Sequence, residues 1–173
     1  KGLETFKFNL KTITPNLIFK ESSIKPLSEE SLTWNLLSSN ILTSDYIDSE
    51  LLENNIKVFI NEHEYPVVWR HANKNRVHYL DVDSLERKAI KQEVQIRWNG
   101  QDLGIDKQGV EILDLASLES FKLLKTIVSQ GAQQYISLFF SDPIDKEQDL
   151  RGLIKLGESD DLSFEIQNNE IKV

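Results

Sequence analysis

Three histidines are the side chains of this sequence that are best suited to bind a metal ion. His63, His71 and His78 are separated by eight and seven residues. Common zinc sites take two ligands at a shorter spacing from one element, whereas these histidines fall on different expected strands or turns. We therefore predict scattered surface histidines and no zinc site.

Two acidic clusters provide oxygen atoms of the kind that Ca²⁺ prefers. The first consists of Asp81, Asp83 and Glu86, and the second of Glu158, Asp160 and Asp161. The first cluster lacks the glycine that the sharp turn of an EF-hand loop requires. Arg87 and Lys88 follow it directly, which indicates local charge balance. We interpret both clusters as solvated surface.

Groups for covalent catalysis are few in this sequence. The chain has no cysteine, which excludes disulfides, thiol nucleophiles, zinc thiolates and thioesters from its 173 residues. It also lacks a G-x-S-x-G elbow, a phosphate-binding glycine loop and a dinucleotide fingerprint. We predict that the chain is not an enzyme, that it has no catalytic, cofactor-binding or metal-binding residue, and that it needs no cofactor.

Three tryptophans could either form a surface on which sugars stack or be buried in the hydrophobic core. Trp34, Trp69 and Trp98 each lie in an alternating segment, where a large ring normally fills the interior of a sandwich. We predict that Trp34 and Trp98 are core residues. We extend that interpretation to Trp69, although Pro66 and Arg70 flank it.

The elements that must position these side chains are mainly strands. Apolar and polar residues alternate over residues 6–10, 32–36 and 94–98, a pattern typical of strands with one buried face. Further strands are expected at 56–60, 67–70, 77–82, 110–115, 121–128, 134–140 and 162–166, and short helical turns at 48–52 and 145–150. This pattern predicts an all-β protein built from tandem antiparallel β-sandwich domains.

Part of the sequence occurs as an internal repeat. Three segments recur in the same order: 3–7 as 118–122, 44–48 (Ser-Asp-Tyr-Ile-Asp) as 141–145 (Ser-Asp-Pro-Ile-Asp), and 56–58 as 154–156. Such a repeat indicates two related domains. The first copy continues through 77–82 and 93–98 without a counterpart in the second. We therefore expect a complete first domain, an incomplete second one, and further parts elsewhere in a larger protein.

The domain boundary is expected at residues 100–109, where three glycines lie among polar residues. We predict a first domain over residues 1–103 and a second over 104–173, with the strand at 110–115 leading into the second. The segment at 16–31 has no equivalent in the second copy, and we assign it no role.

Charge and hydropathy restrict the partners of the chain. Its net charge is −8, which argues against a nucleic-acid interface because that would need a basic face. No stretch approaches the roughly 20 apolar residues of a membrane span. We expect no nucleic-acid partner and no transmembrane segment.

Several short motifs point to a known family. They are Phe-Phe-Ser-Asp-Pro-Ile-Asp at 139–145 with Leu-Arg-Gly-Leu-Ile at 150–154, Phe-Lys-Phe at 6–8, Ile-Thr-Pro at 13–15, Leu-Thr-Trp at 32–34, Ser-Leu-Glu-Arg-Lys at 84–88, Arg-Trp-Asn-Gly at 97–100 and Leu-Gly-Ile-Asp at 103–106. In combination, the chain resembles the N-terminal macroglobulin-like domains of bacterial alpha-2-macroglobulins, which are Ig-like, fibronectin-III-like sandwiches.

The resemblance implies a scaffold role within a cell-envelope peptidase inhibitor, often a periplasmic lipoprotein. In that family a bait region is cleaved, the molecule rearranges and the peptidase is trapped, in some members through a Cys-x-Glu-Gln thioester. The partners implied are peptidases, met by the full-length protein, and neighbouring domains of the same chain. No functional residue transfers, because no bait is recognisable here and the thioester needs a cysteine that the chain lacks.

Two other functions are compatible with tandem Ig-like modules. One is a cell-surface adhesion or glycan-binding protein, which exposed aromatic residues on one face, such as Trp69 or Tyr65, would favour. The other is a non-catalytic sandwich appended to a secreted hydrolase.

Overall fold

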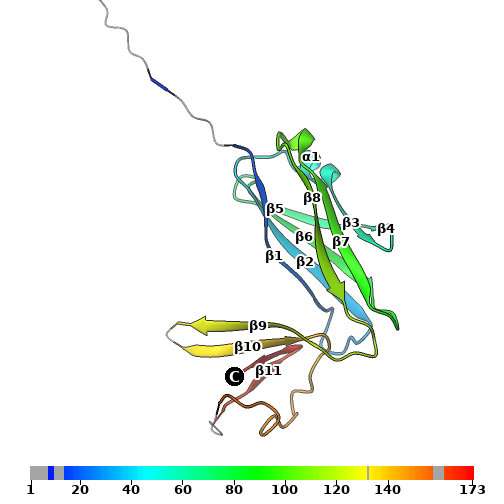
Figure 1. Cartoon of the computed structure of the whole chain (residues 1–173), viewed down its shortest axis with the longest axis vertical. Coiled ribbons are helices and arrows are strands. Elements are labelled where there is room, and N and C mark those ends of the chain that lie inside the picture. Colours follow the sequence, from blue (N-terminus) through cyan, green and yellow to red (C-terminus); the bar gives the residue numbers. More distant parts are fainter. Residues whose placement is uncertain (1–7, 10–13, 132, 158–161) are drawn as a thin grey trace, which may run out of the picture.

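The computed structural model describes residues 8–9, 14–131, 133–157 and 162–173. Within these residues the strands form three antiparallel sheets of four strands each, and the one α-helix is short. Figure 1 shows two sheets facing each other and the third across one end of that pair. The all-β, antiparallel sandwich fold predicted from the alternation is confirmed.

Sheet A has the strand order β1-β2-β6-β5. Its members are β1 (Leu17–Pro26), β2 (Trp34–Thr43), β6 (Val77–Glu86) and β5 (Val68–Ala72). The segment at 16–31, to which the sequence assigned no role, thus supplies an edge strand. Its alternation is masked by polar residues such as Ser22, whose hydroxyl lies 2.8 Å from that of Ser39 on β2.

Sheet B has the order β4-β3-β7-β8. Its members are β4 (His63–Tyr65), β3 (Ile56–Ile60), β7 (Gln92–Asn99) and β8 (Gln108–Leu115). Helix α1 (Ser49–Asn55) leads from β2 to β3. It begins where the Asp48 carboxylate accepts a hydrogen bond from the amide of Leu51 at 3.1 Å, which satisfies one of the free amides of the first turn.

Sheets A and B meet in one hydrophobic core. Leu37 and Leu80 of sheet A and Val58 and Ile96 of sheet B are all fully buried in it. Full burial of such a side chain stabilises a fold by roughly 1.5–3 kcal/mol. The apolar residues of the alternation predicted at 94–98, such as Val94 and Ile96, are therefore on the face of β7 that points into the core.

The phase predicted for β2 is wrong. Trp34 is 45% exposed and not a core residue, because Leu37 and Ile41 set the inward phase of β2. The even-numbered positions to which Leu32 and Trp34 belong lie on the outer face. The inward positions of β2 are displaced by one residue from those predicted, and such a shift moves every side chain to the opposite face.

The predicted domain boundary is also wrong. Strand β8 pairs with β7 from Gln92↔Leu115 to Asn99↔Gln108, so it belongs to the sandwich and does not lead into a second domain. Residues 100–107 form a packed turn that contains the 3-10 helix η1 (Gln101–Leu103) and Ile105, which is 2% exposed.

Gly100 in this turn and Gly109 in β8 allow close approach of their neighbours and are not signs of a flexible linker. A Cβ atom on Gly100 would lie 2.7 Å from Cβ of Ile105, and one on Gly109 would lie 2.7 Å from Nε1 of Trp98. Glycine is the residue that permits such contacts. The chain leaves the sandwich only after Leu115.

Sheet C has the order β11-β12-β10-β9. Its members are β11 (Glu165–Gln167), β12 (Glu170–Lys172), β10 (Gln134–Phe140) and β9 (Leu123–Gln130). The hairpin of β9 and β10 runs across the end of the sandwich in Figure 1. The helical turn predicted at 145–150 is a non-helical turn, in which the amide of Gln148 donates to the Asp145 carbonyl at 3.0 Å.

Sheet C is a structural repeat of sheet A. The order β9-β10-β12-β11 matches β1-β2-β6-β5 strand for strand. At the end of β2, Ser44 and Asn16 exchange two hydrogen bonds, amide to carbonyl at 3.0 Å and amide to hydroxyl at 2.9 Å. At the end of β10, Ser141 and Lys122 exchange the same two bonds at 2.8 and 2.9 Å.

The correspondence continues into the next hairpin. The amide of Ile47 donates to the carbonyl of Asn75 at 3.2 Å, and the amide of Ile144 donates to that of Asn168 at 2.9 Å. Position 44 thus corresponds to 141, 47 to 144 and 75 to 168. The repeat read from Ser-Asp-x-Ile-Asp is a repeat of backbone structure.

The structure does not support the two flanking sequence matches, 3–7 with 118–122 and 56–58 with 154–156, in the same way as the corner. The bonds at the two corners make Lys122 the counterpart of Asn16. The match of 118–122 to 3–7 is therefore out of structural register, and residues 3–7 lie outside the described part of the chain. Residues 154–156 correspond to β3 but form no strand. Of the expected strand at 6–10, Phe8 is described, and it is 70% exposed.

Among the described residues, no helix is long and apolar enough to cross a membrane.

Candidate functional site: the junction between the sandwich and sheet C

Arg87 is the largest fully buried side chain among the described residues. It follows β6 directly, and its amide donates to the carbonyl of Thr33 at 2.9 Å, which fixes the direction of the side chain. Only 1% of that side chain is exposed. A charged group is rarely buried to this extent unless it is paired and fully hydrogen-bonded.

The Arg87 guanidinium connects three separate segments. It donates to backbone carbonyls and to one carboxylate: Nε to Ala116 O at 3.0 Å, Nη2 to Ser117 O at 2.6 Å, Nη1 to Leu32 O at 3.1 Å, Nη1 to Ser141 O at 3.2 Å and Nη1 to Asp142 Oδ1 at 2.6 Å. Longer contacts reach Ser120 O and Asp142 Oδ2 at 3.4 Å. The sandwich, the connecting segment 116–122 and the corner after β10 are thus tied to one side chain.

This arrangement suits arginine and no other residue. A guanidinium presents five donors in one plane, whereas a lysine ammonium has three donors at a single point. Removing one partner of a buried ion pair leaves the other charge uncompensated, which is strongly destabilising. The geometry therefore makes Arg87 a clamp between the sandwich and sheet C.

Ser141 and Asp142 form the acceptor side of the clamp. Ser141 is 3% exposed, and its hydroxyl contacts the carbonyl of Ser120 at 3.0 Å and the carboxylate of Asp142. These bonds orient Asp142 toward Arg87. Pro143 follows and cannot donate to a sheet, so β10 ends at the point where the clamp closes.

Two exposed ion pairs span the junction beside the clamp. Lys125 of β9 lies 3.5 Å from Glu21 of β1, and Lys146 lies 2.7 Å from Glu29. All four side chains are about half exposed or more, and pairs of this kind contribute little to stability. The buried Arg87 dominates the junction.

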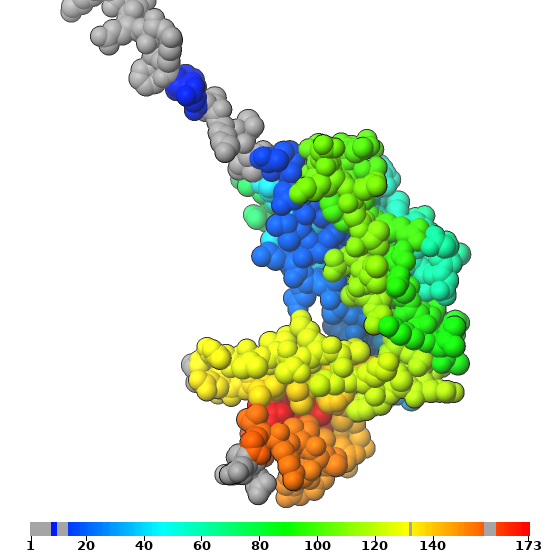
Figure 2. Space-filling model, in the orientation of Figure 1, coloured from blue at the N-terminus to red at the C-terminus, as the bar shows by residue number. Residues whose placement is uncertain are grey.

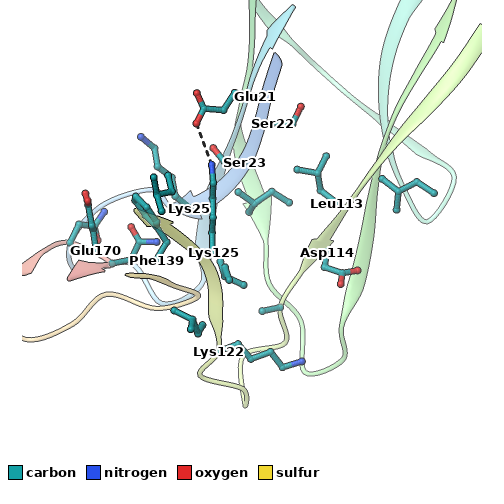
Figure 3. Close-up of a pocket in the computed structure, with 18 of the residues that line it drawn as sticks. Glu21, Ser22, Ser23, Lys25, Leu113, Asp114, Lys122, Lys125, Phe139 and Glu170 are labelled. Atoms are coloured by element: carbon teal, nitrogen blue, oxygen red, sulfur yellow. Dashed lines mark hydrogen bonds and ion pairs between the residues drawn. The ribbon is translucent and has the colours of Figure 1, made fainter. Parts of the chain in front are cut away.

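A cleft of about 760 Å³ lies next to the clamp. Figure 2 shows the molecule hollowed between the sandwich and the yellow hairpin, and Figure 3 shows side chains from β1, β8 and β9 lining the space. Lys125 crosses it toward Glu21, whereas Asp114 is held by Lys91 at 2.7 Å. The walls are edges of three sheets, with both signs of charge.

The prediction of scattered histidines is wrong, because two of them form a pair in which His78 is buried and His71 is partly buried. His71 of β5 lies opposite His78 of β6, and their Nδ1 atoms are 2.7 Å apart, so one ring donates and the other accepts. His71 Nε2 contacts Glu53 of helix α1 at 3.0 Å. His63 lies apart from them on β4, against Tyr65.

Burial, and after it the charge of His71, lower the pKa of His78 to about 4. His78 is fully buried, so its cationic form loses hydration, and its ring contacts are with neutral groups or with the second imidazole, such as the Thr43 hydroxyl at 3.4 Å from Nε2. Across the described residues, no group of three or more His, Cys, Asp or Glu side chains could hold a metal ion.

Two members of the first acidic cluster, Asp81 and Glu86, each pair with a different basic side chain nearby. Asp81 pairs with Arg70 at 3.1 Å, and Glu86 pairs with Lys88. The second cluster, at 158, 160 and 161, lies outside the described part of the chain. Of the tryptophans, Trp69 and Trp98 are half-buried and pack against the core.

Sequence reasoning missed Arg87, because it was interpreted as local balance for the acidic residues before it. Its partners lie from 29 to 55 residues away, a separation that no local pattern reveals. The one available signal was the Ser-Asp-Pro-Ile-Asp corner at 141–145, which was recognised as part of a repeat but not as an acceptor for an arginine.

No family model, curated protein or solved structure matches this chain.

Proposed function

We propose that this chain is a non-catalytic scaffold portion of a bacterial alpha-2-macroglobulin-like peptidase inhibitor, with the bait and any thioester located elsewhere in the protein. The observation that carries the proposal is the junction at Arg87. It joins two related β units through a buried, fully hydrogen-bonded charge, which is a device for holding modules in a set arrangement.

Two of the motifs that carry the family resemblance supply the residues of this junction. Ser-Leu-Glu-Arg-Lys at 84–88 supplies Arg87, and Phe-Phe-Ser-Asp-Pro-Ile-Asp at 139–145 supplies Asp142. These two motifs, 55 residues apart, are among those that carry the family resemblance. A structural role for both explains why scaffold motifs, and not reactive positions, connect this chain to the family.

The mechanism proposed for the chain is mechanical. The clamp fixes one side of the junction, and the cleft and its exposed ion pairs leave the other side open. A joint of this kind keeps the two units connected while a distant cleavage rearranges the remainder of the protein. Contacts between domains that move are generally modest and partly polar.

Adhesion or glycan binding has less support. The aromatic platform considered for it, Tyr65 and Trp69, is half-buried and packs against the core of the sandwich. Its rings are therefore engaged in the fold and do not form an open stacking surface.

Inhibition assays test the proposal directly. Peptidase activity would be titrated with this chain and with the intact protein that contains it, using a large protein substrate. We expect stoichiometric inhibition by the intact protein and none by the chain alone. Inhibition by the 173 residues themselves, or no inhibition by the intact protein, overturns the proposal.

Cell fractionation tests the proposed location. We place the full-length protein in the cell envelope, as a periplasmic lipoprotein, on the basis of the family resemblance. Recovery of the intact protein in the membrane-associated envelope fraction is the expected result. Recovery in the cytoplasm contradicts it.

A further inference from the structure

Side chains from four elements form a continuous chain of hydrogen bonds inside the first unit. Glu53 Oε1 of helix α1 lies 3.0 Å from His71 Nε2, and the Nδ1 atoms of His71 and His78 are 2.7 Å apart. His78 Nε2 lies 3.4 Å from the Thr43 hydroxyl, which donates to the carbonyl of Asp45 at 2.7 Å. Helix α1 and strands β5, β6 and β2 are thus connected through two imidazole rings.

The two ends of this chain fix the positions of its protons. A carboxylate only accepts hydrogen bonds, so Nε2 of His71 carries a proton toward Glu53. The Thr43 hydroxyl gives its single proton to the carbonyl of Asp45, so Nε2 of His78 is the donor in the contact with Thr43. One further proton lies between the two Nδ1 atoms, because their contact at 2.7 Å is a hydrogen bond.

Burial assigns the proton between the rings to His71. Burial lowers the pKa of His78 to about 4, so at about pH 7 this ring is neutral and carries one proton, on Nε2. Its Nδ1 atom therefore accepts, and His71 donates from both ring nitrogens, which makes it an imidazolium. The ring of Trp69 stacks on that of His71 with 5.9 Å between their centroids, which is within the range of cation–π attraction.

Glu53 supplies the charge that balances this imidazolium. Among the described residues, it is the one carboxylate that bonds either ring, and Thr43 and His78 face the pair as neutral groups. Asp45 meets the chain through its carbonyl, because its carboxylate binds Arg76 at 2.8 Å. An imidazolium that donates to a carboxylate forms a charge-assisted hydrogen bond, which is stronger than a neutral one.

The repeat shows that this polar chain is not a requirement of the fold. In the second unit Ile166 and Ile171 pair across β11 and β12 as His71 and His78 pair across β5 and β6. Ile171 is 2% exposed, so an apolar side chain fills the equivalent buried position. The histidines therefore add a property that packing alone does not need.

We propose that Glu53, His71 and His78 form a pH-sensitive latch between helix α1 and the edge strand β5. When His71 is an imidazolium, its charge-assisted bond to Glu53 holds the helix. Loss of one proton leaves two protons on the pair instead of three, one on Nε2 of His71 and one on Nδ1 of His78. The bond to Glu53 is then made by a neutral ring, and Nε2 of His78 faces the Thr43 oxygen without a proton. The latch therefore weakens as the pH rises.

The latch is separate from the junction at Arg87. Helix α1 lies at the end of the sandwich away from sheet C in Figure 1. It connects β2 of sheet A to β3 of sheet B, whereas β5 is an edge of sheet A. The latch thus ties the connection between the two sheets to that edge, independently of the function proposed from the junction.

Nitrogen-15 NMR of the imidazole rings tests the proton positions, because it distinguishes the two tautomers from the imidazolium. The full chain is compared at about pH 5.5, where an ordinary histidine is largely protonated, and at about pH 9, where it is neutral. We expect His71 to change from imidazolium to the Nε2–H tautomer, and His78 to change from Nε2–H to Nδ1–H without being ionised. A single tautomer of His78 at both pH values overturns the proposal.

Two matched variants of helix α1 make this test specific. Glu53→Gln provides an amide that donates to Nε2 of His71, so a neutral His71 satisfies the chain and His78 is expected to keep Nε2–H at both pH values. Glu50→Gln makes the same change of charge on an exposed side chain of the same helix, and the tautomer change of His78 is expected to remain. Loss of the change in both variants, or in neither, contradicts the latch.

Amide hydrogen exchange measures how strongly the latch holds the helix. The protection of amides 52–55 is compared between the wild type and Glu53→Gln at the same two pH values. We expect protection in the wild type to be about threefold to tenfold higher at about pH 5.5, because hydrogen bonds to charged groups are stronger, and nearly equal at about pH 9. A ratio that does not change with pH overturns the proposal.

Discussion

The corners at residues 44–48 and 141–145 have the same backbone design and different surroundings. In both, an aspartate one residue after a serine binds an arginine: Asp45 binds Arg76 at 2.8 Å, and Asp142 binds Arg87 at 2.6 Å. Arg76 comes from the same unit and is 49% exposed, whereas Arg87 comes from the neighbouring unit and is 1% exposed.

This difference teaches how a repeated element acquires a new role. In the second copy the position of Arg76 is taken by Asn169, whose side chain donates to Phe140 O at 2.6 Å. The local arginine is absent there, and Asp142 accepts a guanidinium from the sandwich. The same acidic corner is a surface feature in one unit and the anchor of a junction in the other.

The largest expected effect is that of Arg87→Met. It leaves the carboxylate of Asp142 and several carbonyls without their donor in a buried site, so we expect the free energy of unfolding to fall by about 3–5 kcal/mol. Urea unfolding followed by tryptophan fluorescence measures it. The matched control, Arg76→Met at the equivalent exposed pair, is expected to change stability little. Similar losses in the two variants contradict the role of Arg87 as a clamp.

A double variant refines this comparison. Arg87→Met combined with Asp142→Leu removes both charges, and replacing a whole buried ion pair by apolar residues is often close to neutral. We expect the double variant to recover part of the stability lost by Arg87→Met. A double variant that is less stable than both single variants indicates that the carbonyl contacts, and not the charge pair, hold the junction.

The pair of His71 and His78 gives the next largest effect. Since the folded-state pKa of His78 is lowered to about 4 from 6.5, the unfolded chain binds a proton between these values that the folded chain does not. Stability therefore falls as the pH is lowered from about 6.5 to about 4, by at most about 3 kcal/mol from this group. Unfolding by urea at a series of pH values measures the slope.

The second unit supplies the control for the histidines. Ile166 and Ile171 pair across β11 and β12 where His71 and His78 pair across β5 and β6. The double variant His71→Ile, His78→Ile is expected to fold and to lose most of the pH dependence between 4 and 6.5. An unchanged slope assigns that dependence to other groups.

A smaller difference is expected between the two corner serines. Ser141 is 3% exposed, and Ser141→Ala removes the hydroxyl that accepts from the amide of Lys122 and contacts the carbonyl of Ser120. We expect a loss of about 2 kcal/mol because buried partners stay unsatisfied. Ser44→Ala acts at a half-buried corner where water replaces the lost partner, so a loss of about 1 kcal/mol or less is expected. Thermal unfolding of the two variants distinguishes them, and equal losses contradict the difference in surroundings.

The smallest effect is expected at the exposed corner. The backbone amide of Tyr46 and the side chain of Arg76 lower the pKa of Asp45. Arg76→Gln should therefore raise this pKa part of the way to its ordinary value, because the Tyr46 amide remains in place. NMR titration of the carboxyl carbon measures the shift. An unchanged pKa shows that Arg76 does not interact with Asp45 in solution.

The sequence by itself determined the class of the fold and the repeat. Period-two alternation is a local property of a strand with one buried face, so β3, β6, β7, β8 and β10 were all found. Ser-Asp-x-Ile-Asp recurs as one contiguous pattern of five residues, and its two copies were found for that reason. Strand β1 was missed because its serines interrupt the alternation.

Tertiary structure alone decided phase, sheet membership and the clamp. Whether Trp34 faces inward depends on the neighbouring Leu37 and Ile41, and whether residues 108–115 join the sandwich depends on pairing with β7. The clamp requires that Arg87 and Asp142 meet, although 55 residues separate them. Local patterns report the preferences of a segment, whereas a buried charge is stabilised only when distant carbonyls and a carboxylate converge on it.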